Sequence, residues 1–579
     1  MFDVKIIWKE RLVHVLNALL KEAGISESLT INDIIAEKPP KPEMGDIAFP
    51  MFSFAKLFKK PPQQIAAAAA EALKDGAEAC GPYVNARLDR AVLPAAILGA
   101  VFDTSKDFCG GDTLKGHRIM VEFSSPNTNK PLHLGHLRNN VLGESISRIL
   151  AACGAEVYKV CIINDRGIHI CKSMLAYIEK FNNISPEEAA KKPDHLVGDC
   201  YVEFNTMSKS DSGAEERARE LLRKWEAGDA ATTELWKKMN GWAASGIKET
   251  YKRTGISFDK YYFESDTYLR GKEEVLKGLE KNIFYREDDG SVWADLSAEN
   301  LDKKTLLRKD GTSLYITQDF GTAILRHEDW PFDKLIYVVG SEQRYHFQVL
   351  FTLLSRLGFD WARDLYHLSY GMVNLPEGKM KSREGTVVDA DDLIDKLRDM
   401  ALAEIREKER EEAVGNAEET AEKIALGALH YYLLQITPEK DMLFNPAESL
   451  SFNGNTGPYL QYMGARISSI LKKEDVKNYS APSPAAAALL TSDAEWELLK
   501  TIASWPETLD EAAKKMNPAL ITSWLYELAR NFSRFYHDCP ILNAESVELK
   551  NARMALCLAV LRVMHAAFDL VRIPFLEAM

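Results

Sequence analysis

Two histidines and a lysine stand close together in the stretch SSPNTNKPLHLGH, residues 124–136. His133 and His136 are three residues apart, and Lys130 lies three residues before them. Such side chains could bind a metal ion, donate hydrogen bonds to an anion, or simply be polar residues at a helix start. The stretch follows the apolar run HRIMVEF and leads into LRNNVLGESISRILAAC, whose apolar residues have helical spacing.

This strand-to-helix position favours an anionic ligand. The first turn of a helix presents free N–H groups and the positive end of the helix dipole. Gly135 allows a ligand to approach the backbone closely. The imidazoles of His133 and His136 point the same way and can donate hydrogen bonds to a phosphate chain. No further His, Asp or Cys ligands with suitable spacing follow nearby, so the sequence predicts no metal site.

Composition limits the class of protein. The chain has 579 residues, of which 46% are hydrophobic and 27% charged, and this is typical of a protein with three or four globular domains. We expect cytoplasmic localisation and no membrane association, because no apolar stretch reaches membrane-spanning length and no signal peptide is indicated. Eight cysteines without a CxxC pair predict reduced thiols rather than disulfides or zinc. A net charge of −13 argues against coating of nucleic acid through bulk positive charge, although local patches remain possible.

Three domains are predicted. Residues 1–112 combine an amphipathic helix, in which Trp8, Leu12, Leu16, Leu19 and Leu20 share one side, with a second helix and a strand, which indicates a small α+β domain. Residues 113–390 alternate strands and helices, with a polar helical insertion at about 180–250. Residues 391–579 have almost entirely helical patterns, which predict an α-helical bundle.

The central domain is predicted to contain an open parallel sheet. Five short apolar runs have the character of strands: HRIMVEFSS, EVYKVCII, TSLYITQD, KLIYVVG and YHLSYGMV. Parallel sheets of this Rossmann type bind ligands at the carboxyl ends of their strands. The predicted fold class is therefore α/β, with the small α+β domain before it and the helical bundle after it.

Two motifs resemble those of class I aminoacyl-tRNA synthetases. HLGH looks like their HIGH motif, and GKMKSREG, residues 378–385, looks like their KMSKS loop. The order and spacing of the two motifs also match. The surrounding residues resemble arginyl-tRNA synthetases over essentially the whole chain, in the segments MGDIAFPMFSFAK, GPYVN, FDKYYFES, LYITQD, GSEQRYHFQ, LSFNGNTGPYLQY and FYHDCPIL.

The resemblance implies ATP-dependent activation of L-arginine followed by transfer to tRNA-Arg, a reaction of translation. The carboxylate of the amino acid attacks the α-phosphorus of ATP, so catalysis consists of positioning and charge stabilisation. His133, Gly135 and His136 would contact ATP, Lys379 would neutralise the leaving pyrophosphate, and Mg²⁺ would share that charge. Further ATP-binding positions are implied in the second motif at Met380, Lys381 and Ser382.

The second motif departs from the family pattern. Ser382 stands where the second, usually catalytic, lysine of KMSKS is expected. Arginyl-tRNA synthetases commonly show this loss and carry a lysine just before the HIGH motif, which is the position of Lys130. Lys381 and Arg383 could also contribute. Without the resemblance, Lys130 would be interpreted as a surface lysine.

Residues that select arginine are also implied. A guanidinium presents five donors in a planar fork, so acids and a tyrosine hydroxyl would form a selective pocket. By resemblance, Glu264 and Asp319 bind the guanidinium, and Tyr315 lies four residues before Asp319, on the same side of a strand or a helix. The α-amino and carboxylate groups are assigned to Ser125, Asn127 and Gln343, with His133 nearby. Taken alone, each acid would be interpreted as a surface residue.

Contacts with tRNA are expected at both ends of the chain. Tyr83 and Asn85 match a site of the family that contacts the D-loop, and Lys56, Lys59 and Lys60 could hold the tRNA backbone. The C-terminal helices resemble the anticodon-binding domain of the family. Tyr459 and Gln461 are expected where the catalytic and anticodon-binding domains meet, although a role as core residues fits them equally.

Two other interpretations remain open. One is a catalytically inactive, tRNA-binding or regulatory relative of the synthetases, against which the intact motif residues speak. The other is a small-molecule nucleotidyltransferase, which leaves the long helical C-terminal region unexplained. The resemblance further implies a monomer that activates arginine only when tRNA is bound.

Overall fold

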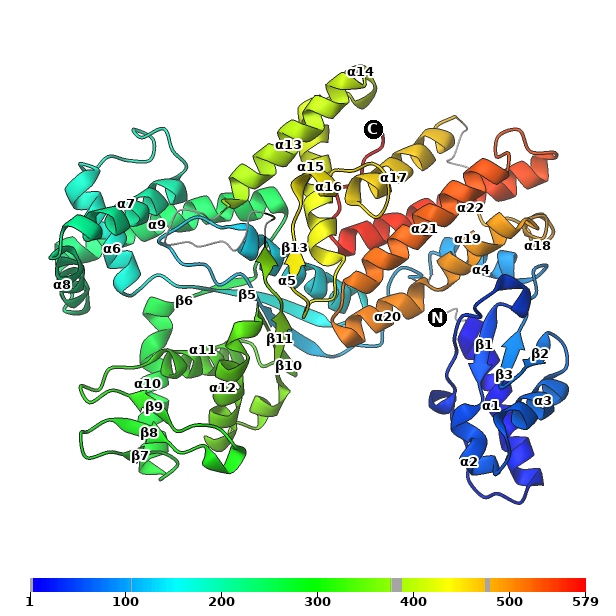
Figure 1. Cartoon of the computed structure of the whole chain (residues 1–579), viewed down its shortest axis with the longest axis horizontal. Coiled ribbons are helices and arrows are strands. Elements are labelled where there is room, and N and C mark those ends of the chain that lie inside the picture. Colours follow the sequence, from blue (N-terminus) through cyan, green and yellow to red (C-terminus); the bar gives the residue numbers. More distant parts are fainter. Residues whose placement is uncertain (1–3, 106, 375, 377–387, 474–479) are drawn as a thin grey trace. The chain divides into compact units, whose positions relative to one another are not determined.

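The computed structural model describes residues 4–579 apart from 106, 375, 377–387 and 474–479. It divides into two compact units, each built from segments that are distant in the sequence. The first unit comprises residues 1–111, 467–510 and 524–566, and the second comprises 112–466, 511–523 and 567–579. Figure 1 shows the elements coloured along the chain. Among the described residues, no helix is both long enough and apolar enough to span a bilayer.

The first unit contains the expected small α+β domain. Helices α1 (Val4–Glu22) and α3 (Pro62–Leu73) accompany an antiparallel sheet of β1 (Ile47–Pro50), β3 (Tyr83–Ala86) and β2 (Ala77–Cys80), in that order. Trp8, Leu12, Leu16 and Leu20 of α1 are buried in the core of this domain, and Leu19 is partly buried. The helical spacing in the sequence therefore identified the buried face of α1 correctly.

A five-stranded parallel sheet is the centre of the second unit. Its order is β11 (Leu365–Tyr370), β10 (Lys334–Gly340), β4 (Arg118–Glu122), β5 (Glu156–Ile163) and β6 (Lys260–Phe263). Because all strands run in one direction, their carboxyl ends share one edge of the sheet. The predicted α/β class with a Rossmann-type parallel sheet is confirmed.

Helices cover the sheet on both faces. Helices α10 (Glu264–Glu280), α11 (Tyr315–Asp329) and α12 (Arg344–Arg356) share an apolar core with Met120, Val160 and Leu335 of the strands. Helix α5 (Leu134–Ala152) lies against Phe123. Phe123 is three residues after Met120, so in an extended strand the two side chains point to opposite faces of the sheet. A Cβ on Gly143 of α5 would be 2.2 Å from the Phe123 ring, so glycine permits this close approach.

One predicted strand is wrong. The second part of TSLYITQD, from Tyr315 on, forms the start of helix α11, in which Ile316, Phe320, Ala323 and Ile324 are buried at helical spacing. The first residues of this helix include apolar and β-branched side chains, so a short window of sequence could not distinguish the two-residue repeat of a strand from the 3.6-residue repeat of a helix. The fifth strand of the sheet is instead β6, whose sequence KYYF has only one buried residue.

The remaining elements are mainly helical, as predicted. Between β5 and β6 lie α6 (Ile168–Lys180), α7 (Pro193–Ser210), α8 (Ala214–Glu226) and α9 (Ala230–Thr254), which share a core of their own. The later helices include α13 (Ala390–Glu407), α15 (Ala417–Leu434), α17 (Gly457–Leu471), α19 (Asp493–Ala503), α20 (Trp505–Lys515), α21 (Ala519–Asp538) and α22 (Val547–Leu570). Shorter elements are α2 (Ala55–Phe58), α4 (Leu93–Phe102), α14 (Glu411–Val414), α16 (Pro446–Ser449), α18 (Pro484–Ala487), β7 (Tyr285–Arg286), β8 (Val292–Ala294), β9 (Lys304–Leu307), β12 (Val373–Asn374) and β13 (Met442–Leu443).

Arg138 connects α5 to two other segments of the second unit. Its guanidinium is 1% exposed and donates to the carbonyls of Gly371 (2.6 Å), Met372 (3.2 Å), Pro438 (3.1 Å) and Lys440 (2.8 Å). Planar donors in a fixed fork can serve several acceptors at once. Arg138 therefore holds the helix that follows HLGH against the chain beyond β11 and beyond α15.

Replacing Arg138 with lysine should lower the free energy of unfolding by about 3 kcal/mol, because one ammonium cannot satisfy four buried carbonyls. Urea unfolding followed by circular dichroism measures the change. The matched control is Arg219→Lys on α8, whose side chain is 58% exposed and where we expect less than about 0.5 kcal/mol. Equal stability of the two variants would contradict the role given to Arg138.

Candidate active site

The HLGH segment begins α5 through its own side chains. His133 is the N-cap residue, and its Nδ1 accepts a hydrogen bond from the Gly135 N–H at 3.1 Å. Nδ1 of His136 accepts from the N–H of His133, also at 3.1 Å. The two rings lie 3.9 Å apart between centroids. The histidines thus satisfy two of the N–H groups that a helix start leaves unpaired.

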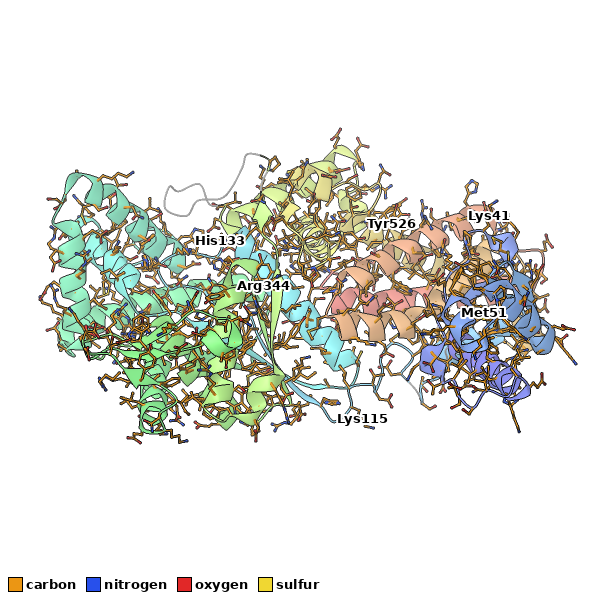
Figure 2. The ribbon with its side chains drawn as sticks, turned by 60° about the horizontal axis from the view of Figure 1, so that its bottom comes forward. Lys41, Met51, Lys115, His133, Arg344 and Tyr526 are labelled. Carbon is orange, nitrogen blue, oxygen red and sulfur yellow. The ribbon has the colours of Figure 1, made fainter. Side chains whose placement is uncertain are left out.

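These hydrogen bonds set the protonation of both rings. A nitrogen that accepts a hydrogen bond carries no proton, so the proton of each neutral ring is on Nε2. Burial, and next the charge of Lys130, lower the pKa of His133 to about 4. Burial also lowers the pKa of His136 well below its ordinary value, helped by His133 and Lys130. Near neutral pH the two rings therefore offer two Nε2–H donors, as an anionic ligand requires. His133 is labelled in Figure 2.

Lys130 is a partly buried cation beside these donors. Burial lowers the pKa of its ammonium group, and in the described part of the chain no acidic group offsets that effect. Among the described residues, its ammonium group has no acceptor within hydrogen-bonding distance. Burying a charge without a partner is costly, so this arrangement favours a negatively charged ligand. Lys130 and His133 line one cavity of about 230 Å³, together with residues of α7 and of the start of α13.

The turn before HLGH is held in an unusual conformation. Ser124 and Ser125 have φ values of 76° and 47°, in the left-handed region that residues other than glycine rarely adopt. Tyr251 and Asn139 hold Ser124 through its hydroxyl (2.6 Å) and its N–H (2.5 Å). Ser125 donates to Glu122 at 2.9 Å. Asn127 follows this turn and is exposed. Ser125 and Asn127, both predicted to bind the substrate, therefore lie just beyond the carboxyl end of β4.

A second group of polar residues surrounds Glu264, the first residue of α10. Glu264 is 9% exposed, and burial raises its pKa to about 7. The charge of Arg166 lowers this pKa, whereas the charges of Asp165 and Asp319 raise it further. When the Gln318 amide is oriented to suit its neighbours, its nitrogen donates to Glu264 at 2.7 Å and its oxygen accepts from Arg166 at 3.1 Å. A buried carboxylate with spare acceptor capacity suits a cationic ligand.

Asp319 of α11 belongs to the same region. It is close enough to Glu264 to affect its pKa, and its Oδ2 lies 2.5 Å from Nε2 of His346. Tyr315 is one helical turn before Asp319 and is 75% exposed. Gln343 is exposed in the short helix Ser341–Gln343 that follows β10. The structure therefore brings Glu264 and Asp319 together, and places Tyr315 and Gln343 on adjoining elements.

Three residues of this region were not predicted from the sequence. Arg166 follows β5, Gln318 precedes Asp319, and His346 is the third residue of α12. The position of Arg166 just beyond a strand of the parallel sheet was a usable signal, because ligands bind at such ends. Gln318 and His346 had no such signal, since their contacts join different helices.

The second motif cannot be placed. Lys379, Met380, Lys381 and Ser382, with Arg383, lie outside the described residues. Their assigned roles remain predictions from the sequence.

Comparisons with known proteins cover nearly the whole chain. Residues 104–445 match the family described as tRNA synthetases class I (R), catalytic domain. Residues 8–88 match the arginyl tRNA synthetase N terminal domain, and residues 460–579 match the DALR anticodon binding domain. The arginine–tRNA ligase of Treponema denticola is 56% identical, with 100% of each chain covered.

The chain belongs to the arginyl-tRNA synthetase family. The arginine–tRNA ligase of Parabacteroides distasonis is 45% identical over 96% of this chain and 98% of its own. Among solved structures, the arginyl-tRNA synthetase of Thermus thermophilus is 25% identical and superimposes with a TM-score of 0.82 over 99% of this chain and 100% of its own. The chain is an arginine–tRNA ligase, an enzyme of translation that uses ATP, with an anticodon-binding domain of the DALR type.

The synthetase exposes aromatic and basic residues on its N-terminal domain. Tyr83 is half-buried and contacts the ring of Phe52, which is 54% exposed, in an edge-to-face arrangement with centroids 5.6 Å apart. Lys56, Lys59 and Lys60 are exposed on and just after α2. Aromatic rings beside lysines suit unpaired bases and their phosphates.

Two other predicted tRNA residues of the synthetase have structural contacts. Asn85 is 2% exposed and donates to the Met44 carbonyl at 2.9 Å. Gln461 of α17 is fully buried and donates to the carbonyls of Lys423 (2.9 Å) and Pro574 (2.8 Å). Tyr459, two residues earlier, is half-buried. For Gln461, the alternative role as a core residue describes its contacts in this structure.

Proposed function

We propose that this synthetase forms arginyl-adenylate at the carboxyl end of β4 and then transfers arginine to the 3′ end of tRNA-Arg. The observation that carries the proposal is the HLGH turn. It presents two neutral imidazole donors and the start of α5 beside Lys130, a cation without an acceptor among the described residues. This combination suits a phosphate chain.

In the first step, an oxygen of the arginine carboxylate attacks the α-phosphorus of ATP. A P–O bond forms to the carboxylate, the bond to the β-phosphate breaks, and pyrophosphate leaves with the electron pair. No side chain forms a covalent bond. We assign Nε2–H of His133 and His136 to the phosphates and ribose, and the charge of Lys130 to the negative charge that accumulates in the transition state. Lys379 is assigned to pyrophosphate from its place in the sequence.

Mg²⁺ is proposed to arrive with ATP. This hard cation prefers oxygen ligands, whereas Lys130, His133 and His136 provide only nitrogen. Lys130, His133 and His136 therefore do not fit a resident Mg²⁺ site, and the phosphates themselves would supply its ligands.

The guanidinium of arginine is assigned to Glu264 and Asp319. Gln318 donates to one oxygen of Glu264 and itself accepts from Arg166, which leaves acceptor capacity on Glu264 for the ligand. Tyr315 and Gln343 adjoin this pocket, and Ser125 and Asn127 are assigned to the α-amino and carboxylate groups. A substrate without the guanidinium would leave the spare acceptor capacity of the buried Glu264 unused, which is the physical basis of selection.

For tRNA, we assign Tyr83 to base stacking and Lys56, Lys59 and Lys60 to the phosphates. Asn85 is assigned to support of the backbone at Met44, to which it donates. Tyr459 and Gln461 are assigned to the junction between the catalytic and anticodon-binding domains. We propose functional domains at 1–112, 113–390 and 391–579, a monomer, and action in the cytoplasm, where ATP and tRNA are present. The alternative of an inactive tRNA-binding relative has no support in the segment KPLHLGH, which retains both imidazoles and Lys130.

The activity should appear in ATP–pyrophosphate exchange. We expect exchange with arginine when tRNA is added and none without tRNA, because the family generally activates its amino acid only with tRNA bound. Lysine and glutamate in place of arginine are the controls. Exchange with either of these and none with arginine would contradict the assigned specificity.

Replacing Lys130 with alanine should lower kcat of exchange by a factor of about 100 or more, since it removes a cation from the transition state. The KM for arginine should change little, because the guanidinium pocket is separate. Lys115→Ala, at an exposed position before β4, is the control and should retain full activity. An active Lys130→Ala enzyme would remove Lys130 from the catalytic residues.

Binding of arginine should depend on the ionisation of Glu264. Because burial raises the pKa of this carboxyl to about 7, it is ionised above pH 7 and protonated below it. We expect kcat/KM for arginine to fall towards tenfold per pH unit below 7. In Glu264→Gln, kcat/KM for arginine should be low and should not change with pH in this range. Glu273→Gln, at an exposed position on the same helix, should behave like the wild type. An unchanged profile in Glu264→Gln would contradict the assignment.

A further inference from the structure

Charged side chains join the start of α7, the end of α9 and the start of α13 in the second unit. Nζ of Lys192, just before α7, lies 2.7 Å from Oδ2 of Asp391 and 2.6 Å from the hydroxyl of Thr250. Arg253 of α9 lies 3.3 Å from Oδ1 of Asp391 and 2.7 Å from Asp395. Both oxygens of Asp391 are therefore paired with cations of the helical insertion.

His195 and Asp389 face each other at the edge of this network. Nε2 of His195, in the first turn of α7, lies 3.5 Å from Oδ2 of Asp389. Within the described part of the chain, these two atoms are buried and neither has a hydrogen-bond partner. A buried polar atom without a partner costs free energy. A shift of a few tenths of an ångström would join the two atoms and satisfy both.

Asp389 lies directly behind the HLGH segment. One of its oxygens caps α13 by accepting from two backbone N–H groups. Its neighbours in the chain pair with the segment on either side of His133: Leu134 N–H donates to Val388 O (3.2 Å), and Ala390 N–H donates to Leu132 O (3.0 Å). A displacement of Asp389 would therefore be transmitted to the backbone of His133.

Helix α7 also supports Lys130. A Cβ on Gly198, one turn after His195, would lie 2.6 Å from Cδ of Pro131 and 3.7 Å from Cα of Lys130. The helix that carries His195 is thus packed on the backbone next to Lys130. His195, Asp389, Lys130 and His133 all line the same cavity.

A metal ion does not explain this cluster. Ligand atoms of Asp194, His195 and Asp391 do lie within 4.8 Å of one another. However, the ammonium group of Lys192 is 2.7 Å from Asp391 and 3.3 Å from Asp194, so a positive charge already occupies the group. The arrangement is an ion-pair network in which Nε2 of His195 lies 3.5 Å from Asp389 and 3.8 Å from Asp391. Asp391 is already paired with Lys192 and Arg253, whereas Oδ2 of Asp389 has no hydrogen-bond partner among the described residues.

We propose that His195 is a positioning residue of the adenylation site. Its imidazolium donates to Asp389, and this contact holds the backbone of His133 and the support of Lys130 in the geometry that binds ATP. The proposal rests on the proposed assignment of Lys130 and His133 to ATP. His195 acts through Asp389 and does not itself contact the reacting atoms.

Acidic groups around His195 favour its charged form. Asp391, followed by Asp389 and Asp194, raises the pKa of His195 against the effect of burial. Other charged or titratable groups that share its cavity or network are Lys192, Asp199 and Tyr201 of the α7 segment, Lys130 and His133, Asp392, and Arg253 of α9. Because the folded pKa is raised, the imidazolium is present at lower pH, and the contact is lost as pH rises through that pKa.

The test uses the full-length enzyme in tRNA-dependent exchange, with His195→Gln and Asp389→Asn. Glutamine cannot carry the charge, and asparagine keeps the helix cap while removing the carboxylate. We expect kcat/KM for ATP to fall about tenfold in each variant, from loss of a charge-assisted hydrogen bond. The KM for arginine should stay within about twofold, since the guanidinium pocket is untouched.

Two readouts separate positioning from general structural damage. The double variant should be no worse than either single variant, because both remove the same bond. The wild type should lose kcat/KM for ATP as pH rises through the pKa of His195, and His195→Gln should lack this loss. His14→Gln, an exposed histidine on α1, is the control and should retain the wild-type profile. Additive losses, or an unchanged profile in His195→Gln, would overturn the proposal.

Lys130→Ala distinguishes this proposal from the one on which it rests. If Lys130→Ala is inactive while His195→Gln is fully active, only the role of His195 fails. If Lys130→Ala is active as well, the ATP site itself has been placed wrongly.

Discussion

The hydrogen bonds at the start of α5 determine what the proposed active site can do. His133 and His136 accept from backbone N–H groups that the helix start leaves unpaired. The same bonds stabilise the helix, fix the tautomer of each ring, and leave Nε2–H free for a ligand. The local fold and the chemistry of the site therefore depend on one interaction, and a ring that became protonated on Nδ1 would lose both.

Unbalanced charge distinguishes the site from the core beneath it. Under the turn at Ser125, the buried Glu122 is fully compensated, since Arg326 donates at 2.7 Å and the Ser125 hydroxyl at 2.9 Å. Above the turn, Lys130 has no acidic partner among the described residues, and burial shifts the pKa of Glu264 to about 7. A buried cation without a partner and a buried carboxyl whose pKa is raised both reduce stability, so we propose that these groups are held for charged substrates.

The helical insertion supports the site from behind. Helix α7 packs on Pro131 without an intervening side chain at Gly198, and the charged network around Asp391 connects it to α13. Elements separated by almost 200 residues in the sequence thus share one set of ion pairs. In the proposed function the insertion is therefore part of the catalytic framework, and the proposed role of His195 follows from that connection.

The sequence by itself determined the fold class, the family and the place of the HLGH turn. Helical spacing gave the buried face of α1, and motif residues close together in the chain, such as Lys130 and His133, carry their own signal because a strand end and a helix start position them locally. TSLYITQD was predicted wrongly because a short apolar window fits both periods. Only the tertiary structure decided that Gln461 is buried, that Gln318 connects Arg166 to Glu264, and that His195 faces Asp389. Those contacts join separate elements, and no local pattern of residues encodes which distant side chain lies within 4 Å of another.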